Sequence, residues 1–353
     1  MKQATRKQSR APAAIVAVVA IAAIAAVSIV FASCGSPAPR KIADRNGMTF
    51  GLAVKAGDIY TPETVKIMKS HFNLIVPEDS MKWVNIRPKK DFWNWADMDA
   101  MVEFAEKNGM KIKGHTFLWQ DQNGPYVHSL KTREEAVELL TDHITTIMTR
   151  YKGRVVEYDV ANEIFNEDGP RRATRWRRRR GDDFRDIACP AARAADPDAK
   201  LILCDYNTEY AGTAKGDASY ELVKELKGRG VPVDGVAFQL HCMAELPFNE
   251  AALRENVRRF HAMGVTCSFS EVDVRIKLPA DEVTIALQND VYERLATIAR
   301  TEPGAKSLIL WGLSDKGSWI PRAFPGFGSA NVFDKDMKKK PAYHALMKGL
   351  SGK

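Results

Sequence analysis

Residues 111–163 contain three patterned segments, KIKGHTFLW (111–119), TREEAVELLTDHITTIMTRY (132–151) and EYDVANE (157–163). The first and third are short runs rich in apolar residues, whereas the second places its apolar residues on one side of a helix. A strand, a long amphipathic helix and a second strand in this order indicate parallel strands joined by a helical crossover. The stretch therefore predicts an α/β fold with a parallel sheet.

The same alternation continues from residue 50 to the end of the chain, with helical patterns such as 97–108 and 341–348. Eight repeats over about 300 residues fit a closed (β/α)8 TIM barrel better than an open doubly wound sheet. No GxGxxG follows the first strand and no GxxxxGK[ST] occurs, so nucleotide-binding folds have no support. The predicted strands are 50–54, 73–78, 111–119, 157–163, 200–206, 235–241, 267–274 and 307–315.

The N-terminal segment has a different composition. Residues 1–12 are basic and polar, and residues 13–32 carry no charge. This order is typical of an export signal, and the apolar part is long enough to span a bilayer. The sequence FASC, ending at Cys34, is similar to a lipoprotein signal, although Phe31 replaces the usual leucine. We expect 1–34 to be a signal peptide, lipoprotein signal or membrane anchor, 35–41 a linker, and 42–353 one exported barrel domain.

The net charge of +8 is concentrated in two places. The first 33 residues hold four positive charges and no acid, and seven arginines lie between Arg171 and Arg180. Without these two groups the chain has a net charge of −3. A nucleic-acid-binding domain usually carries basic residues across a whole face, so we expect no nucleic-acid partner.

The five cysteines show no CxxC spacing, which argues against a structural zinc site. Cys204, Cys242 and Cys267 lie on or just after predicted strands, and we interpret them as small buried apolar residues. A disulfide between two of the five remains open for an exported protein, and the sequence does not select a pair.

Polar residues gather at the ends of the predicted strands, where TIM barrels place their active sites. Glu163 ends the fourth strand and Glu271 lies on the seventh. A single carboxylate there is usually solvated or salt-bridged. Two of them beside aromatic residues fit glycoside hydrolysis, which needs one neutral acid and one carboxylate. The other polar or aromatic residues at these ends are Glu78, His115, Trp119, Asn162, Asp205, Gln239, His241 and Trp311.

Tryptophans supply flat apolar surfaces that sugar rings stack on. We expect Trp83, Trp119, Trp311 and Trp319 to serve this purpose. For Trp93 and Trp95 we expect core packing instead.

Eight motifs in order, from about residue 42 to 350, resemble glycoside hydrolase family 10, the endo-1,4-β-xylanases. Most of them coincide with a predicted strand end or the loop beside it. The matching segments are 78–83 (EDSMKW), 114–119 (GHTFLW), 159–163 (DVANE), 205–207 (DYN), 234–241 (DGVAFQLH), 270–273 (SEVD), 311–315 (WGLSD) and 340–343 (KPAY).

The resemblance implies that Glu163 is the acid/base and Glu271 the nucleophile of a retaining double displacement. Their carboxyl groups should then lie about 5–5.5 Å apart. The negative charge of Glu271 favours the protonated form of Glu163, and it disappears once Glu271 is glycosylated.

By the same resemblance, Asn162 bonds the sugar 2-hydroxyl, and His241, held by Asp273, orients Glu271. The implied substrate is xylan or xylo-oligosaccharides, with no metal and no cofactor. We expect a monomer that meets a membrane only through its N-terminal segment. The implied glycone-side residues are Glu78, Lys82, His115, Trp119, Gln239, Trp311 and Trp319.

Three features depart from the family pattern. Asp79 stands where the family usually has asparagine, and Gln120 where it usually has histidine. We expect both to border the sugar-binding groove and to change affinity or sugar preference while the glutamate chemistry survives. The third is the run Arg171–Arg180, followed by Pro190 inside the next predicted helix, where it should introduce a kink. We favour a solvated loop over a patch that binds the acidic groups of glucuronoxylan or an anionic surface.

Two alternatives remain open. A barrel β-glucanase or mannanase would also place glutamates on the fourth and seventh strands. A carbohydrate-binding lipoprotein without catalysis is the other, and the presence of both Glu163 and Glu271 argues against it.

Overall fold

Eight parallel strands close into a barrel within residues 37–174, 176 and 183–353, the part of the chain that the computed structural model describes. Each strand pairs with the next, and β8 pairs with β9, which returns to β1. The predicted (β/α)8 barrel is therefore confirmed. Its strands are β1 Thr49–Val54, β2 Leu74–Pro77, β3 Lys111–Leu118, β4 Glu157–Asn162, β5 Lys200–Asp205, β6 Gly235–Phe238, β8 Thr266–Lys277 and β9 Ser307–Leu310.

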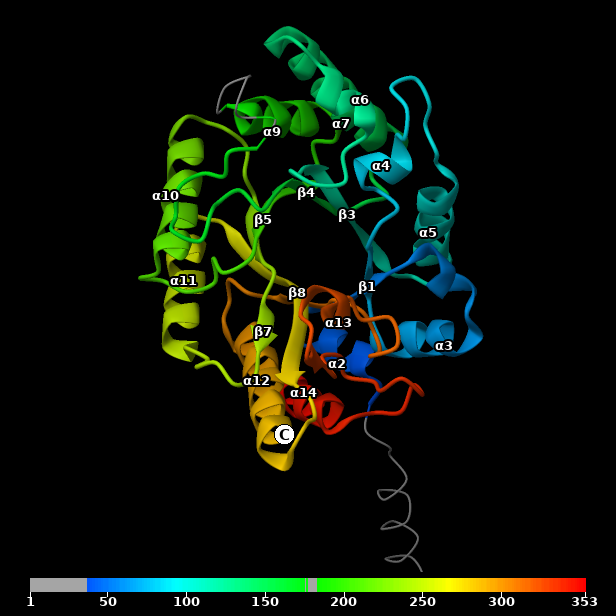
Figure 1. Cartoon of the computed structure of the whole chain (residues 1–353), viewed down its shortest axis with the longest axis vertical. Coiled ribbons are helices and arrows are strands. Elements are labelled where there is room, and N and C mark those ends of the chain that lie inside the picture. Colours follow the sequence, from blue (N-terminus) through cyan, green and yellow to red (C-terminus); the bar gives the residue numbers. More distant parts are fainter. Residues whose placement is uncertain (1–36, 175, 177–182) are drawn as a thin grey trace, which may run out of the picture. The chain divides into compact units, whose positions relative to one another are not determined.

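Helices surround the ring of strands, with α10 and α11 on one side and α3 and α5 on the other (Figure 1). Two short strands outside the barrel pair with the long β8. They are β7 His241–Met243 and β10 Phe327–Gly328. The long helices are α3 Pro62–His71, α5 Ala96–Lys107, α7 Arg133–Arg150, α9 Phe184–Ala195, α10 Ala214–Gly228, α11 Glu250–Ala262, α12 Glu282–Thr301 and α14 Pro341–Ser351. The short ones are α2 Pro39–Arg45, η1 Ala56–Tyr60, α4 Trp83–Ile86, α6 Pro125–Ser129 and α13 Ile320–Ala323.

Local sequence explains where the helices begin. At α7 the Thr132 side chain accepts from the Glu135 N–H while the Glu135 carboxylate accepts from the Thr132 N–H, a reciprocal cap. Pro190 lies inside α9, which runs through it from Phe184 to Ala195. Pro39 starts α2, so the last three residues of the predicted linker are helical.

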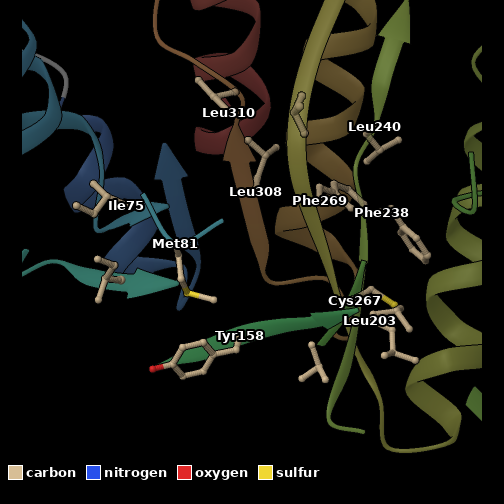
Figure 2. Close-up of a cluster of buried hydrophobic side chains, with 14 of the residues drawn as sticks. Ile75, Met81, Tyr158, Leu203, Phe238, Leu240, Cys267, Phe269, Leu308 and Leu310 are labelled. Carbon is tan, nitrogen blue, oxygen red and sulfur yellow. The ribbon is translucent and has the colours of Figure 1, made fainter. Parts of the chain in front are cut away.

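Side chains alternate along each strand between two apolar regions. In β1, Leu52 and Val54 belong to the large core between strands and helices, and Ala53 packs inside the barrel with Val76 and Ile309. Figure 2 shows part of the large core, where Phe238, Phe269, Leu308 and Leu310 of three strands lie together. This two-sided burial explains the near-continuous apolar runs in the sequence.

A β-bulge in β8 reverses this alternation at the candidate site. Phe269 and Val272 pair with β9 residues that are only two positions apart, so β8 contains one extra residue. Phe269 before the bulge and Val272 after it both pack in the large core. Glu271 and Asp273 are consequently turned to the inside of the barrel, as bulges beside active sites commonly achieve. Similar register shifts follow His115 in β3 and Asp159 in β4.

The predicted export segment, 1–34, and the arginines at 175 and 177–180 lie outside the described residues. Among the described helices none has the length and apolar character needed to cross a membrane.

Candidate active site

A pocket of about 1100 Å³ opens at the C-terminal ends of the barrel strands. It brings together residues from all parts of the barrel that are far apart in sequence. Asp273 lies beneath it and contacts two of its lining residues. The predicted site residues that line it are Glu78, Lys82, His115, Trp119, Asn162, Glu163, Gln239, His241, Glu271, Trp311 and Trp319.

Glu271 is a buried carboxylate, 5% exposed, that is joined to the partly buried His241 and through it to the buried Asp273. His241 Nε2 lies 3.2 Å from Glu271 Oε2, and His241 Nδ1 lies 3.0 Å from Asp273 Oδ2. The Trp319 Nε1–H donates to the same Asp273 oxygen at 2.8 Å. The imidazole is therefore held between two carboxylates, and Trp319 is fixed by one of them.

Two opposing effects set the charge of this group. Burial alone raises the pKa of Glu271, but the hydrogen bond from His241 and the electrostatic influence of His115 and His241 outweigh it, so the pKa is lowered. Burial would likewise lower the pKa of His241, whereas Asp273 and Glu271 raise it to about 10. At neutral pH the arrangement is an imidazolium between two carboxylates.

Glu163 occupies a strained position directly after β4. Its φ of 54° lies in the left-handed region, which costs a non-glycine residue about 1–3 kcal/mol. The Asp205 carboxylate accepts from the N–H groups of Ile164 at 2.6 Å and Phe165 at 3.0 Å. These bonds hold the turn that points Glu163 into the pocket.

Arg172 clamps the same turn from its carbonyl side. The guanidinium donates to the main-chain oxygens of Glu163 at 3.2 Å and Phe165 at 3.0 Å, and to the Tyr206 hydroxyl at 2.7 Å. Arg171 pairs with Glu225 at 2.6 Å. The first two arginines of the run 171–180 thus have partners on the barrel, whereas the other five lie outside the described residues, where the solvated loop stays a prediction.

A charged layer inside the barrel supports the floor of the pocket. Lys113 is 1% exposed, and its Nζ lies 2.9 Å from Asp159 Oδ1. The other Asp159 oxygen lies 2.9 Å from His115 Nδ1. Burial raises the pKa of Asp159, but Lys113 and His115 more than compensate, and the pKa is lowered. His115 is oriented toward the pocket by this carboxylate.

Amides and charges line the predicted glycone side. The Gln239 amide donates to Asn162 Oδ1 at 3.1 Å, which orients both side chains. Lys82 Nζ lies 3.3 Å from Asp79 Oδ1 and 5.1 Å from the ring centroid of Trp119. Burial raises the pKa of Glu78, against the nearby positive charge of Lys55.

The tryptophans divide differently from our expectation. Trp119, Trp311 and Trp319 line the pocket. Trp83 does not, because its ring is 2% exposed and stacks on His143 with 3.5 Å between centroids. Its assignment as a sugar-stacking residue was wrong, since the helix α4 turns it into the core. Trp93 and Trp95 stack on each other beside the core, as expected.

Sequence reasoning missed three contacts of the site. Cys204 Sγ lies 3.5 Å from Glu271 Oε1, so it contacts that carboxylate as well as filling space. Gln120 Nε2 donates to Glu163 Oε2 at 2.6 Å, whereas we had expected it at the sugar groove. The contact of Arg172 with the main chain of Glu163 was not recognised, because Arg172 is one of several arginines in the run 171–180. The position of Cys204, one residue before a strand-end aspartate, was the only signal for the first.

The four described cysteines are free, and the fifth, Cys34, lies outside the described residues. Within the described ranges no group of three or more His, Cys, Asp or Glu side chains is arranged to hold a metal ion.

Comparisons with known proteins show which family the chain belongs to. The chain is 33% identical over 312 residues to endo-1,4-beta-xylanase B of Thermotoga neapolitana, covering 87% of this chain and 90% of that protein. It is 34% identical over 305 residues to endo-1,4-beta-xylanase A of Phanerodontia chrysosporium, covering 85% of this chain and 74% of that protein.

Solved structures of xylanases superpose well on this chain. Native xylanase 10B from Thermotoga maritima superposes with a TM-score of 0.85 at 35% identity, covering 89% of this chain and 98% of that one. Xylanase 10B from Thermotoga petrophila RKU-1, solved in complex with xylobiose, gives a TM-score of 0.86 at 34% identity, covering 90% and 98%. The sequence profile of glycosyl hydrolase family 10 matches residues 39–349, and the chain belongs to that family.

Proposed function

We propose that the chain is an endo-1,4-β-xylanase that cleaves xylan with retention of anomeric configuration. The observation that carries this proposal is a pair of glutamates in one pocket with different surroundings. Glu271 is bonded to an imidazolium and kept anionic, whereas the donor to the Glu163 carboxyl is an uncharged amide, which stabilises an anion less than a charged donor does. Two carboxyl groups whose surroundings separate their charge states are the basis of acid and nucleophile roles.

In the first step, Glu163 gives its proton to the glycosidic oxygen as that bond breaks, and Glu271 attacks the anomeric carbon. The aglycone leaves with the proton, and the glycone is joined to Glu271 as an ester. In the second step, the Glu163 carboxylate takes a proton from water, whose oxygen displaces Glu271. Both glutamates then return to their starting states.

Neighbouring groups support each step. The bonded pair Asn162 and Gln239 provides amides for the hydroxyl next to the anomeric carbon, where bonds strengthen in the transition state. Trp119, Trp311 and Trp319 provide apolar faces for the rings. His241 and Asp273 position Glu271 and maintain its charge.

The cellular location is a separate proposal. We propose that the chain acts outside the cytoplasm, as a lipoprotein, an anchored protein or a secreted one. The basic residues 1–12 followed by the uncharged 13–32 support this proposal.

The substrate is tested with a panel of soluble xylan, mannan and carboxymethylcellulose. We expect clear preference for xylan, measured as reducing ends released per enzyme. Preference for either other polymer would instead favour a barrel mannanase or glucanase. Xylan binding without turnover would favour a binding protein that has lost catalysis.

Replacing each glutamate should separate their roles. Glu271→Ala should abolish release of products from xylohexaose and from aryl xylosides, because no covalent intermediate forms. Glu163→Ala should slow xylohexaose cleavage by about 10²–10⁴-fold and spare much of the first step on aryl xylosides with acidic leaving groups. Equal losses on both substrates in Glu163→Ala would contradict the assignment.

The role of Arg172 can be tested by comparing its variants with variants of other arginines in the same run. Arg172→Ala should lower kcat on unsubstituted xylan by about 10–100-fold with little change in KM, because Glu163 loses its alignment. Arg172→Lys, which keeps the charge without the fork of donors, should show most of that loss.

Neutralising the arginines at 177–180 is the matched control, and it should leave activity on unsubstituted xylan intact. Equal losses in the control and in Arg172→Ala would refute a specific role for Arg172.

A further inference from the structure

Gln120 follows β3 and reaches the carboxyl group of Glu163. Its Nε2 donates to Glu163 Oε2 at 2.6 Å. Its Oε1 is buried and has no hydrogen-bond partner among residues 37–174, 176 and 183–353. Both side chains line a small cavity of about 40 Å³ that adjoins the main pocket at Trp119, Asn162 and Glu163, whereas Gln120 does not line the main pocket. The amide therefore contacts the carboxyl group of Glu163 from outside the main pocket.

We propose that Gln120 is a positioning residue that sets the proton equilibrium of Glu163 and thereby the upper pH limit of activity. The inference rests on the proposed role of Glu163 as acid/base. It assigns Gln120 to the proton donor rather than to the choice of sugar.

The chemistry of an amide explains how this works in both halves of the reaction. When Glu163 is a carboxylate, the Nε2–H donates to it. When Glu163 is protonated, a half-turn about the terminal torsion of Gln120, which has broad, roughly two-fold preferences, presents Oε1 to accept the O–H. Both states keep a hydrogen bond, but the one to the charged state is stronger. Gln120 therefore favours the carboxylate.

An amide also adds no ionisation of its own, because it only donates and accepts hydrogen bonds. A histidine at this place would change charge near neutral pH and alter Glu163 as it did so. With Gln120, the loss of activity at high pH should follow the single ionisation of Glu163.

Charged groups of both signs surround Glu163. Arg172, on the loop after β4, donates to its main-chain oxygen, and Arg185 of α9 lines the same small cavity. Asp205 at the end of β5 holds the following turn, and Glu167 and Glu271 line the main pocket with Glu163. Tyr206 lines the pocket and is bonded to Arg172. The arginines at 177–180 lie outside the described residues.

The test compares pH profiles of kcat/KM on xylohexaose for the wild type, Gln120→Met and Gln120→Glu. Activity falls at high pH when Glu163 loses its proton. Methionine has a similar size but cannot donate, so Glu163 should keep its proton longer and the alkaline limb should move up by about one pH unit. Glutamate adds a second carboxyl that shares the proton, so the limb should move up further.

The acid limb should stay in place in both variants, because it reports the ionisation of Glu271. The upward shift should shrink on an aryl xylobioside whose leaving group needs no proton. Asp79→Asn, the other departure from the family pattern, is the matched control and should change KM without moving the alkaline limb.

The inference is overturned if the alkaline limb stays in place in Gln120→Glu, or if both limbs move together. Gln120→Glu keeps the size and polarity of the side chain, so it decides the matter if circular dichroism shows Gln120→Met to be unfolded. Glu163→Gln separates the two proposals. Full activity of Glu163→Gln on xylohexaose would remove the acid/base assignment, whereas the absence of a limb shift in the Gln120 variants would remove only the role of Gln120.

Discussion

The site depends on one physical constraint. A carboxylate has to be buried away from water and still stay ionised. Burial by itself drives Glu271 toward its neutral form, which is a poor nucleophile. The ion pair of His241 with the buried Asp273 reverses that effect, and Trp319 donates to the same aspartate. Removing one partner of such an arrangement leaves an uncompensated buried charge. The charged side chains Glu271, His241 and Asp273 therefore form one unit.

The strands of the barrel place several charged side chains in its interior. The bulge in β8 turns Glu271 and Asp273 inward, and a second charged layer, Lys113 with Asp159 and His115, lies on β3 and β4. Two buried ionic groups in a protein interior are costly unless both are fully paired. Most of the apolar core lies between strands and helices, which leaves part of the inside of the barrel available for polar side chains.

The periodic spacing of apolar residues was sufficient to predict the strands, the helices and the closed barrel. Strand ends indicated Glu163 and Glu271, because a parallel barrel collects those ends on one face. The bulges could not be predicted, since one extra residue in a strand leaves no mark in an apolar run, yet it decides which way Glu271 points. Trp83 was misassigned because a motif does not show which side of a short helix faces the groove. Arg172 and Gln120 were misjudged because their roles depend on contacts across 9 and 43 residues of chain.

The central claim is that Glu271 forms the covalent bond and that His241 keeps it ionised. The most direct measurement is the pH dependence of covalent labelling by an aryl 2-deoxy-2-fluoro-xylobioside, followed by mass spectrometry of the intact protein and its peptides. Because the pKa of Glu271 is lowered from 4.5, wild-type labelling should persist below that pH and map to Glu271. In His241→Asn burial dominates, so the labelling rate should fall off at a higher pH. A label on another residue, or an acid limb at the same pH in both proteins, would contradict the account.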